Sequence, residues 1–318
     1  MKRSEHYIDL AGPGCHGKLV RPGAVGTVLR CVEPVARDTV RMSALHCSRM
    51  VGRPWKELSK AWDIRYAGHT RSPQGGTRLV FAAPSLQEAA PGLFEQGMLF
   101  EDGPKPQDTA FDLIAEVLRD VSARRAESTR FDAHLLGTLT RFGVALRRGI
   151  QSMTLGGDRL TMNPPPLIDK DLTASAAMLV RETPKPKRVR ISGKLDMIRA
   201  SDRAFELILN DGERLRALWV ESTVAPLHEC FGRPVLVEGM AVFRASGTVL
   251  RVDAEAIAPL DEVQSFFSKM PEPVISFRKQ LERSAAPTRG QSGFAAIYGK
   301  WPGDETEKEM LAALEEIS

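Results

Sequence analysis

The 318-residue sequence predicts an α+β fold that includes a small five-stranded β-barrel. Three observations support this prediction. Before about residue 183, apolar residues recur alternately at helical and at strand spacing. After the proline-rich stretch Thr183–Arg188 the period becomes that of strands, and in residues 293–318 it returns to that of helices. The chain is long enough to build two hydrophobic cores.

Composition and cysteine spacing limit the class of protein. The chain is 42% hydrophobic and 26% charged, which is ordinary for a globular protein. No apolar run approaches the roughly 18 residues of a membrane helix, and the N-terminus MKRSEHYIDL has no apolar signal region. We therefore expect a cytoplasmic protein without membrane contact. The cysteines show no metal-binding spacing, so we expect buried free thiols and no metal site.

Residues 1–183 are predicted to form a mixed α+β domain of unknown role. Apolar spacing, first-turn prolines and glycine-rich turns define its elements. The expected strands are Tyr7–Leu10, a hairpin of Asp63–Ala67 with Thr77–Ala82, and a hairpin of Ile150–Leu155 with Arg159–Met162. The expected helices are one from Pro22 with a second segment over Val40–Met50, one capped by Asp108, one over Phe131–Leu146 and one over Asp171–Arg181. We interpret Arg141, Arg147 and Arg148 as complementing a helix dipole, in preference to nucleic-acid contacts.

Gly12–Gly17 matches the glycine pattern GxGxxG of a dinucleotide-binding loop. Such a loop must lead directly into a helix, whereas Lys18–Pro22 is predicted to be extended. The sequence also contains no nucleophile elbow, no HExxH motif and no phosphate-loop lysine. We therefore expect a binding protein that is not an enzyme and has no cofactor.

Residues 188–262 are predicted to form the barrel, after a stiff, proline-punctuated linker. The expected elements are strands Val189–Ile198, Ala204–Leu209 and Arg214–Val220, a helix within Ser222–Phe231, and strands Val235–Phe243 and Thr248–Ile257. Asn210-Asp211-Gly212 is typical of a hairpin turn. Five strands with a helix between the third and the fourth are the plan of an OB-like barrel.

The barrel carries a basic cluster that could bind single-stranded nucleic acid, as OB-folds often do. Its candidate residues are Lys187, Arg188, Arg190, Lys194, Arg214 and Arg216. The barrel aromatics Phe205, Trp219 and Phe243 could stack on bases, but their alternation also suits a core position. A barrel that docks a protein or serves only structure is the alternative interpretation.

The C-terminal part divides into a helical segment with a flexible leader, residues 263–292, and a tail, residues 293–318. Prolines at 271 and 273 interrupt the helical segment Gln264–Arg283. Two apolar stripes at helical spacing follow in the tail: Phe294, Ile297, Tyr298 and Trp301, then Met310, Leu311, Leu314 and Ile317. Asp304 and Glu307 form a capping box for the second tail helix. The stripes predict a partner surface or, alternatively, docking of the tail on its own domain.

The run Tyr298-Gly299-Lys300-Trp301-Pro302-Gly303-Asp304-Glu305-Thr306 resembles the tails of bacterial antitoxins that are encoded beside PIN-domain ribonuclease toxins. Glu309, Ala312–Glu315 and Ser318 continue the resemblance. It implies a small PIN-type toxin as partner, an enzyme that cleaves RNA with magnesium held by carboxylates. It also implies that Trp301 and Tyr298 fill the substrate groove and that Lys300 or Arg289 lies against the acidic pocket. The implied partner-binding residues are Phe294, Ile297, Tyr298, Lys300, Trp301, Met310, Leu311 and Leu314.

Charge is unevenly distributed along the chain. The tail has two lysines against six carboxylates and carries −4, so the net charge of +4 leaves the rest of the chain at +8. A basic body with an acidic tail suits two kinds of partner, or a tail that folds back on the body. The first hypothesis is an antitoxin-like protein whose body serves dimerisation or operator DNA binding. The alternative is a single-stranded nucleic-acid-binding protein acting through the barrel, with a regulatory tail.

Overall fold

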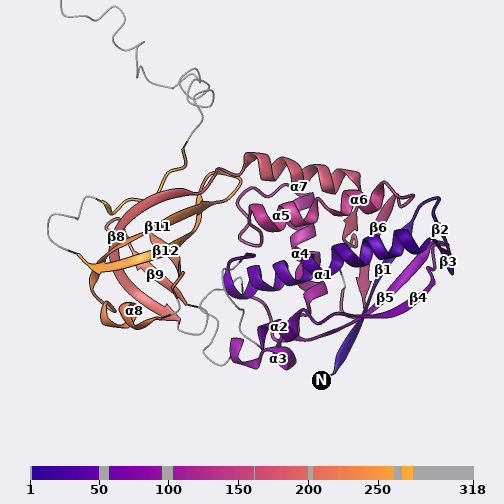
Figure 1. Cartoon of the computed structure of the whole chain (residues 1–318), viewed down its shortest axis with the longest axis horizontal. Helices are drawn as coiled ribbons and strands as arrows, with labels where there is room; N and C mark the ends of the chain where they lie inside the picture. The colour runs from indigo at the N-terminus through magenta and orange to yellow at the C-terminus, as the bar shows by residue number, and fades with distance from the viewer. Residues whose placement is uncertain are drawn as a thin grey trace, which may run out of the picture. The chain divides into compact units, whose positions relative to one another are not determined.

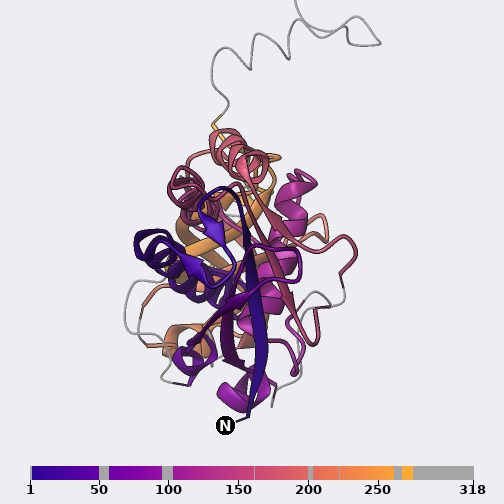
Figure 2. The ribbon, with the colours of Figure 1, turned by 90° about the vertical axis from the view of Figure 1, so that its right-hand side faces the viewer.

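A five-stranded antiparallel sheet with strand order β4-β5-β1-β6-β7 forms one layer of the N-terminal part. Its strands are β1 Arg3–Ala11, β4 Arg65–Arg71, β5 Thr77–Pro84, β6 Ser152–Gly157 and β7 Leu167–Ile168. The central strand β1 begins near the N label in Figures 1 and 2. His6, Ile8 and Leu10 alternate onto its buried face, as the period of two in a half-buried strand requires.

The computed structural model describes residues 2–49, 57–94, 103–160, 162–199, 203–221, 223–260 and 267–274. All of these residues belong to one compact unit, Met1–Val274, which contains both the N-terminal part and the barrel. The predicted tail and most of the predicted leader lie outside the described residues. Within the described ranges, no helix combines the length and the apolar character needed to cross a membrane.

Helices form the second layer and share one hydrophobic core with the buried face of the sheet. They are α1 Pro22–Leu45, α2 Leu58–Ala61, α3 Leu86–Ala89, the 3₁₀ turn η1 Pro91–Leu93, α4 Ala110–Ser122, α5 Ala133–Leu139, α6 Phe142–Leu146 and α7 Lys170–Glu182. Two short strands, β2 Cys15–His16 and β3 Leu19–Val20, connect β1 to α1. The predicted α+β class is therefore confirmed.

Helix α1 is one continuous helix, so the prediction of a separate segment from Val40 is wrong. Pro22 occupies the first turn as predicted, and Pro34 lies inside the helix. Pro34 lacks one backbone donor, but the apolar stripe continues across it, because Val28, Val35 and Val40 are all fully buried. Continuous burial of this stripe outweighs the local cost of the proline.

Helix α4 is capped by Thr109, and the prediction that Asp108 is the cap is wrong. The Thr109 hydroxyl accepts from the Asp112 backbone N–H, and the Asp112 carboxylate accepts from the Thr109 N–H at 2.8 Å. This reciprocal pair is a capping box, which satisfies two backbone donors at once. The Asp108 carboxylate accepts from the Lys105 backbone N–H at 2.8 Å.

The predicted helix over Phe131–Leu146 is two helices, α5 and α6. The Thr140 hydroxyl donates to the Gly137 carbonyl at 2.7 Å, and the Arg141 N–H donates to the Thr138 carbonyl in a tighter turn. Glycine and threonine are weak helix formers, and their clustering explains the break. The predicted apolar face is nevertheless buried throughout, from Phe131 to Leu146.

Strand β6 pairs with β1 and β7, so the predicted hairpin between Ile150–Leu155 and Arg159–Met162 is wrong. A turn closes directly after β6, where the Leu160 N–H donates to the Gly157 carbonyl at 3.1 Å. The chain then passes through its proline run before pairing as β7. Gly156 and Gly157 belong to β6 itself, where Gly156 leaves room for the Tyr7 ring beside it on β1.

The second half of the described chain is a closed five-stranded barrel, as predicted, with strand order β10-β12-β11-β8-β9. Its elements are β8 Lys187–Arg199, β9 Ala204–Ile208, β10 Arg214–Trp219, α8 Ala225–Glu229, β11 Pro234–Phe243 and β12 Val249–Pro259. Each lies within a few residues of its predicted bounds. The pair β10–β12 is parallel, and the other pairs in the barrel are antiparallel.

The described residues 267–274 contain no α-helix, which contradicts that part of the predicted helical segment. Pro271 and Pro273 each remove a backbone donor. Ser268 accepts from the Asn210 N–H at 2.7 Å, and Met270 packs on the barrel core. These contacts hold the segment in an irregular conformation beside the β9–β10 turn.

A buried arginine joins the barrel to the N-terminal helices. Arg251 of β12 lies 3.5 Å from the Asp132 carboxylate and donates to the His46 carbonyl at 3.0 Å. Arg251 and Asp132 are 5% and 6% exposed, so this pair is shielded from water. The Asp132 carboxylate also accepts from the Ser48 N–H and from the Leu135 N–H, which makes it the N-cap of α5.

Breaking this pair should destabilise the fold strongly. Burial alone would raise the pKa of the Asp132 carboxyl, but Arg251 and the hydrogen bonds from Ser48 and Leu135 outweigh it and hold that pKa below its usual value. We expect Arg251→Met to lower the free energy of unfolding by about 3–5 kcal/mol at pH 7, because Asp132 would be left charged and buried. Urea unfolding followed by tryptophan fluorescence measures the change.

The matched control is Arg3→Met, which breaks the more exposed pair with Asp63 and should cost about 1 kcal/mol or less. The pKa of Asp132 is lower in the folded protein than in the unfolded chain, where it is about 3.9. The ionised carboxylate therefore stabilises the fold fully above about pH 3.9, and this stabilisation is lost as the pH falls through the folded-state pKa. The difference between Arg251→Met and the parent should therefore shrink at about pH 3. Equal losses of unfolding free energy in Arg251→Met and Arg3→Met would contradict the conclusion that the buried Arg251–Asp132 pair holds the fold together.

Candidate functional site

A cleft of about 340 Å³ lies where helices α1 and α4 face the outer surface of strands β8, β9 and β10. We call it the barrel cleft. Its walls combine apolar and ionised side chains: Thr39, Met42, Ser43, His46, Gly103, Pro104, Leu113, Glu116, Val117, Thr129, Arg130, Met197, Glu206, Arg214 and Arg216. Concave surfaces that combine apolar residues with a few polar groups are candidate ligand sites.

The C-terminal turns of α1 supply the first wall. Thr39, Met42, Ser43 and His46 stand at i, i+3, i+4 and i+7, which places them on one helix face. His46 is the C-cap and takes the left-handed conformation, with φ of 53°. Its ring Nδ1 then lies 3.2 Å from Nη1 of Arg216 on the barrel.

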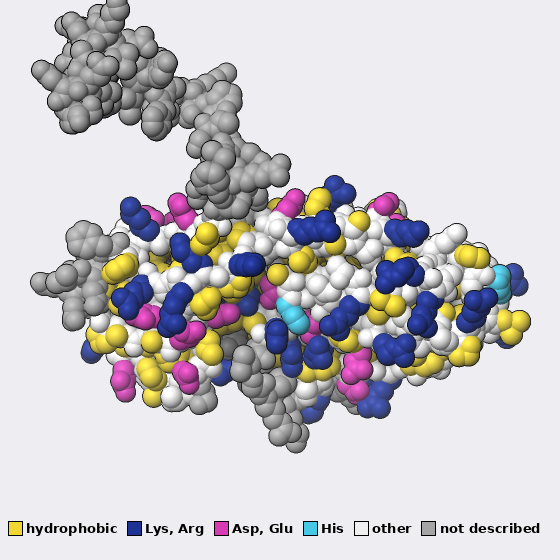
Figure 3. Space-filling view, turned by 45° about the horizontal axis from the view of Figure 1, so that its top comes forward, with side chains coloured by type: hydrophobic (Ala, Val, Ile, Leu, Met, Phe, Trp, Pro, Cys, Tyr) yellow, Lys and Arg dark blue, Asp and Glu magenta, His cyan; other side chains and the backbone are white. Residues whose placement is uncertain are grey.

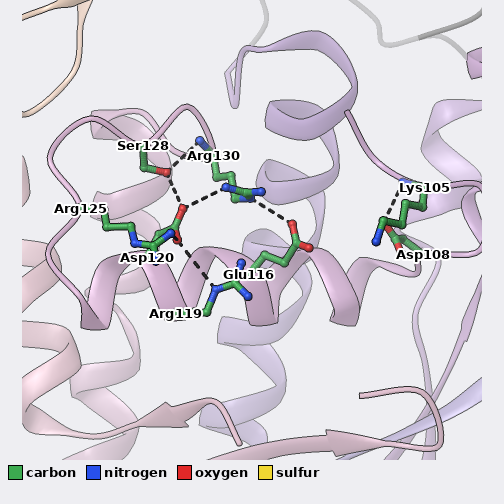
Figure 4. Close-up of polar contacts among 8 residues, drawn as sticks. All are labelled: Lys105, Asp108, Glu116, Arg119, Asp120, Arg125, Ser128 and Arg130. Carbon is green, nitrogen blue, oxygen red and sulfur yellow. Dashed lines mark hydrogen bonds and ion pairs between the residues drawn. The ribbon is translucent and has the colours of Figure 1, made fainter. Parts of the chain in front are cut away.

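Helix α4 and the loop after it supply the second wall. Arg130 Nε lies 3.0 Å from Glu116 Oε2, and its Nη1 lies 3.3 Å from Asp120 Oδ2. Asp120 is buried and also accepts from Ser128 Oγ at 2.8 Å and from Arg125 at 3.1 Å. Figure 4 shows these groups converging on the Asp120 carboxylate. The buried carboxylate fixes the loop on α4 and so sets the direction of Arg130.

The barrel supplies the third wall through alternate residues of β10. Leu215 and Ala217 point into the barrel core, so Arg214 and Arg216 point outward. Arg214 pairs with Glu206 of the neighbouring strand at 2.8 Å. The cleft therefore contains three arginines and two glutamates. Each glutamate pairs with one of the arginines, Glu116 with Arg130 and Glu206 with Arg214.

His46 contributes a neutral ring to this cleft. Burial first, and then three neighbouring arginines, lowers the pKa of His46 to about 3. The arginines are Arg216, Arg199 and Arg251. At neutral pH the ring can therefore accept a hydrogen bond at Nδ1 from the Arg216 guanidinium.

The structure separates the six predicted nucleic-acid-binding residues into two groups. Arg214 and Arg216 line the cleft. The other four lie exposed along β8: Lys187, Arg188, Arg190 and Lys194. Of these, Lys187 donates to the Glu272 carbonyl at 3.2 Å. The predicted set is thus not a single continuous groove.

Two of the exposed arginines on β8 have carboxylate partners on the neighbouring strands. Arg188 lies 3.2 Å from Glu255 of β12, and Arg190 lies 2.9 Å from Glu238 of β11. Exposed pairs of this kind contribute about 0–1 kcal/mol to stability. Their carboxylates reduce the positive potential of this face of the barrel.

The barrel aromatics are core residues. Phe205, Trp219 and Phe243 are 2%, 5% and 1% exposed and pack together with the other residues of the barrel interior. Trp219 also donates its ring N–H to the Thr223 carbonyl at 2.6 Å. None of the three offers a ring face for stacking a base.

The predicted partner-binding residues of the tail lie outside the described residues. The glycine run Gly12–Gly17 contains the short strand β2 and is followed by β3, and α1 begins only at Pro22. Gly12 has φ of 141°, and a side chain there would collide with the backbone of Gln151. Gly12 is therefore required because two backbone segments approach each other closely at this point.

The four cysteines are free and buried.

Sequence reasoning missed most of the cleft. His46, Glu116 and Arg130 come from three separate segments and belong to no recognisable motif. The spacing from Thr39 to His46 marks a helix face, but nothing in it distinguishes a cleft wall from a buried stripe. Only the packing of α1 and α4 against the barrel brings these residues together.

No protein-family model matches the sequence, and no curated protein matches it significantly.

The low pKa of His46 predicts that its ring does not titrate in the ordinary range. Its imidazole NMR shifts should stay constant from pH 8 to about pH 4.5, because the folded-state pKa is about 3. The unfolded chain binds this proton near pH 6.5, so His46 should lower stability progressively as pH falls from about 6.5 to 3. The His46→Gln variant assigns the signal and should weaken this pH dependence. Titration of His46 near pH 6.5 would contradict a buried ring.

Proposed function

We propose that this protein binds single-stranded nucleic acid and receives one unstacked nucleotide in the barrel cleft. The observation that carries the proposal is the position of the cleft, which opens on the outer face of β9 and β10 between three arginines. In OB-folds the face of the second and third strands is the one that binds oligonucleotides. Strands β9 and β10 are the second and third strands of this barrel.

An OB-like identity of the barrel is part of the proposal. The supporting features are the strand order, the parallel pair β10–β12, and helix α8 between the third and fourth strands. The β11–β12 turn does not lie open, because the Ser246 N–H donates to the Ala126 carbonyl and Thr248 donates to Glu127 at 2.7 Å. The turn after α4 thus covers the β11–β12 turn, whereas the cleft lies at the face of β9 and β10.

The chemistry of the cleft suits a nucleobase. The partly exposed Met197 can contact the face of a flat ring, whereas Met42 and Val117 lie beneath the cleft surface, 1% and 2% exposed. Glutamate oxygens accept from exocyclic amino groups, and arginine forks donate to ring nitrogens, carbonyl oxygens or phosphate. The cleft volume of about 340 Å³ lies near the lower end for small-molecule sites. This size favours one nucleotide over a stacked strand.

The test is equilibrium binding of a labelled single-stranded oligonucleotide at low salt. Arg214→Gln should weaken binding about fivefold or more, since one arginine–base contact is worth about 1–3 kcal/mol. Arg190→Gln is the matched control, because it too is an exposed arginine paired with a glutamate, but it lies outside the cleft. It should change the dissociation constant less than about twofold, as expected of a solvated surface pair. Equal effects of both variants, or no binding at about 50 mM salt, would refute the cleft as the site.

A second candidate function rests on the tail sequence. The run from Tyr298 to Thr306 resembles antitoxin tails, and the acidic tail differs in charge from the basic body. We propose that the tail binds and neutralises a co-encoded PIN-type ribonuclease, while the body binds nucleic acid. The acidic tail and the basic body suit two different partners, which agrees with two binding functions in one chain.

Trp301 should be the central contact of this second function. Replacement by alanine should cost about 2–4 kcal/mol of binding to the toxin, the range of a buried aromatic anchor. Lys300→Glu should also weaken binding, because it would place a negative charge against an acidic metal site. Co-expression with the toxin provides the measurement: deletion of residues 293–318 should restore toxicity, and the tail on a carrier should suppress it. Full protection by the truncated chain would exclude the tail as the neutralising element.

A further inference from the structure

Two segments of the N-terminal part contain basic residues but no Asp or Glu: residues 10–32 and residues 133–157. The first supplies Lys18, Arg21 and Arg30, and the second supplies Arg141, Arg147 and Arg148. All six side chains are exposed. We call the five arginines among them the arginine row.

The two segments lie side by side. The Gly14 N–H donates to the Gly149 carbonyl at 2.9 Å, and the Cys31 thiol lies 3.6 Å from the Arg141 carbonyl. The Arg148 guanidinium lies over the first turn of α1, where a side chain on Gly23 would come within 3.4 Å of it. Residues far apart in sequence therefore contribute to one basic surface along α1 and α6.

The arginine row differs from the basic residues of the barrel in its partners. Among the described residues, none of its five arginines has a carboxylate within the 4.0 Å of an ion pair. The nearest acidic residues on α1 are the exposed Glu33 and the buried Asp38, which pairs with Arg37 at 2.9 Å. Figure 3 shows Lys and Arg side chains recurring over the N-terminal part with few carboxylates among them. Asp169 and Asp171 line a pocket with Gly149 at the edge of the row, but the described ion pairs join neither of them to a row arginine. The guanidinium groups can therefore bind an external anion.

We propose that the arginine row binds the phosphodiester backbone of nucleic acid. Arg30 lies seven residues, about two helical turns, after Gly23, so it faces the same side of α1 as the Arg148 guanidinium, about 10 Å further along the helix axis. The guanidinium fork matches phosphate oxygens in a bidentate geometry, and five of the six exposed basic residues in the two segments are arginines. No arginine of the row lines the barrel cleft, so this surface extends the proposed function and can be tested apart from it.

The surface suits nucleic acid better than an acidic protein. Protein interfaces have an apolar centre with a polar rim. In the two described segments, the exposed large apolar side chains are Leu19 and Val144. Leu19 belongs to β3 and Val144 to α6, and two isolated apolar side chains are ordinary on a protein surface. A row of charges without an apolar centre is the pattern of phosphate contacts, which position a nucleic acid without reading its sequence.

The test compares two pairs of substitutions in the full chain. Arg141→Gln with Arg148→Gln removes two charges from the row, and Arg181→Gln with Arg233→Gln removes two exposed charges elsewhere. Fluorescence anisotropy follows binding of a mixed-sequence 20-mer, single-stranded and double-stranded, across a range of NaCl concentrations. The double variant of the row should weaken binding about tenfold. The slope of log K against log[NaCl] should become less negative by about 1–2, because each lost phosphate contact removes about 0.7–0.9 from the slope. The control pair should change affinity less than about twofold, because its charges make no phosphate contact.

Each outcome decides the proposal. A stronger loss on one of the two nucleic acids identifies which form the row binds. Equal losses from the two pairs would show a general charge effect and overturn the proposal, as would an unchanged salt dependence for the row pair. Competition by poly-glutamate as effective as competition by an oligonucleotide of equal charge would overturn it in favour of an acidic protein. The Arg214→Gln variant in the same series separates the row from the cleft: loss by the row pair alone would support the row and refute the cleft.

Discussion

The buried contact between Arg251 and Asp132 is the constraint on which the geometry of the barrel cleft depends. It fixes the barrel strand β12 to the N-cap of α5, and through the His46 carbonyl it also holds the end of α1. Because α1 and the barrel form opposite walls of the cleft, the geometry of the cleft follows from this contact. Burial raises the pKa of the neighbouring Cys47 to about 11, so the thiol stays neutral beside the guanidinium.

The barrel could be predicted from the sequence because its signals are local. Strand alternation and the turn at Asn210–Gly212 locate β9 and β10, and their observed bounds differ from the predicted ones by a residue or two. In α1, tertiary packing outweighs a local signal, because burial of the apolar stripe continues the helix through Pro34. At the end of α5 the reverse holds, since clustered glycine and threonine break the helix although the apolar face continues. The cleft has no local signal, since its walls come from distant segments.

Charge is where the sequence-based interpretation and the structure differ most. The sequence predicts a basic cluster on the barrel, but Arg188 and Arg190 each have a glutamate on the neighbouring strand. The sequence interpretation assigns Arg141, Arg147 and Arg148 to a helix end, and these three have no ion-pair partner among the described residues. Carboxylates that pair across strands are invisible to a reading along the chain. Sequence charge therefore overestimates the potential of the barrel face and underestimates that of α1 and α6.

The central claim is that the body of this protein places single-stranded nucleic acid in the barrel cleft. Photo-crosslinking of the full chain to an oligonucleotide containing 4-thiouridine, followed by peptide mapping, tests it most directly. The account predicts crosslinks to the C-terminal turns of α1, residues 39–46, and to β10, residues 214–219. Crosslinks confined to the exposed residues 187–194 of β8, or none under conditions where binding is complete, would contradict it.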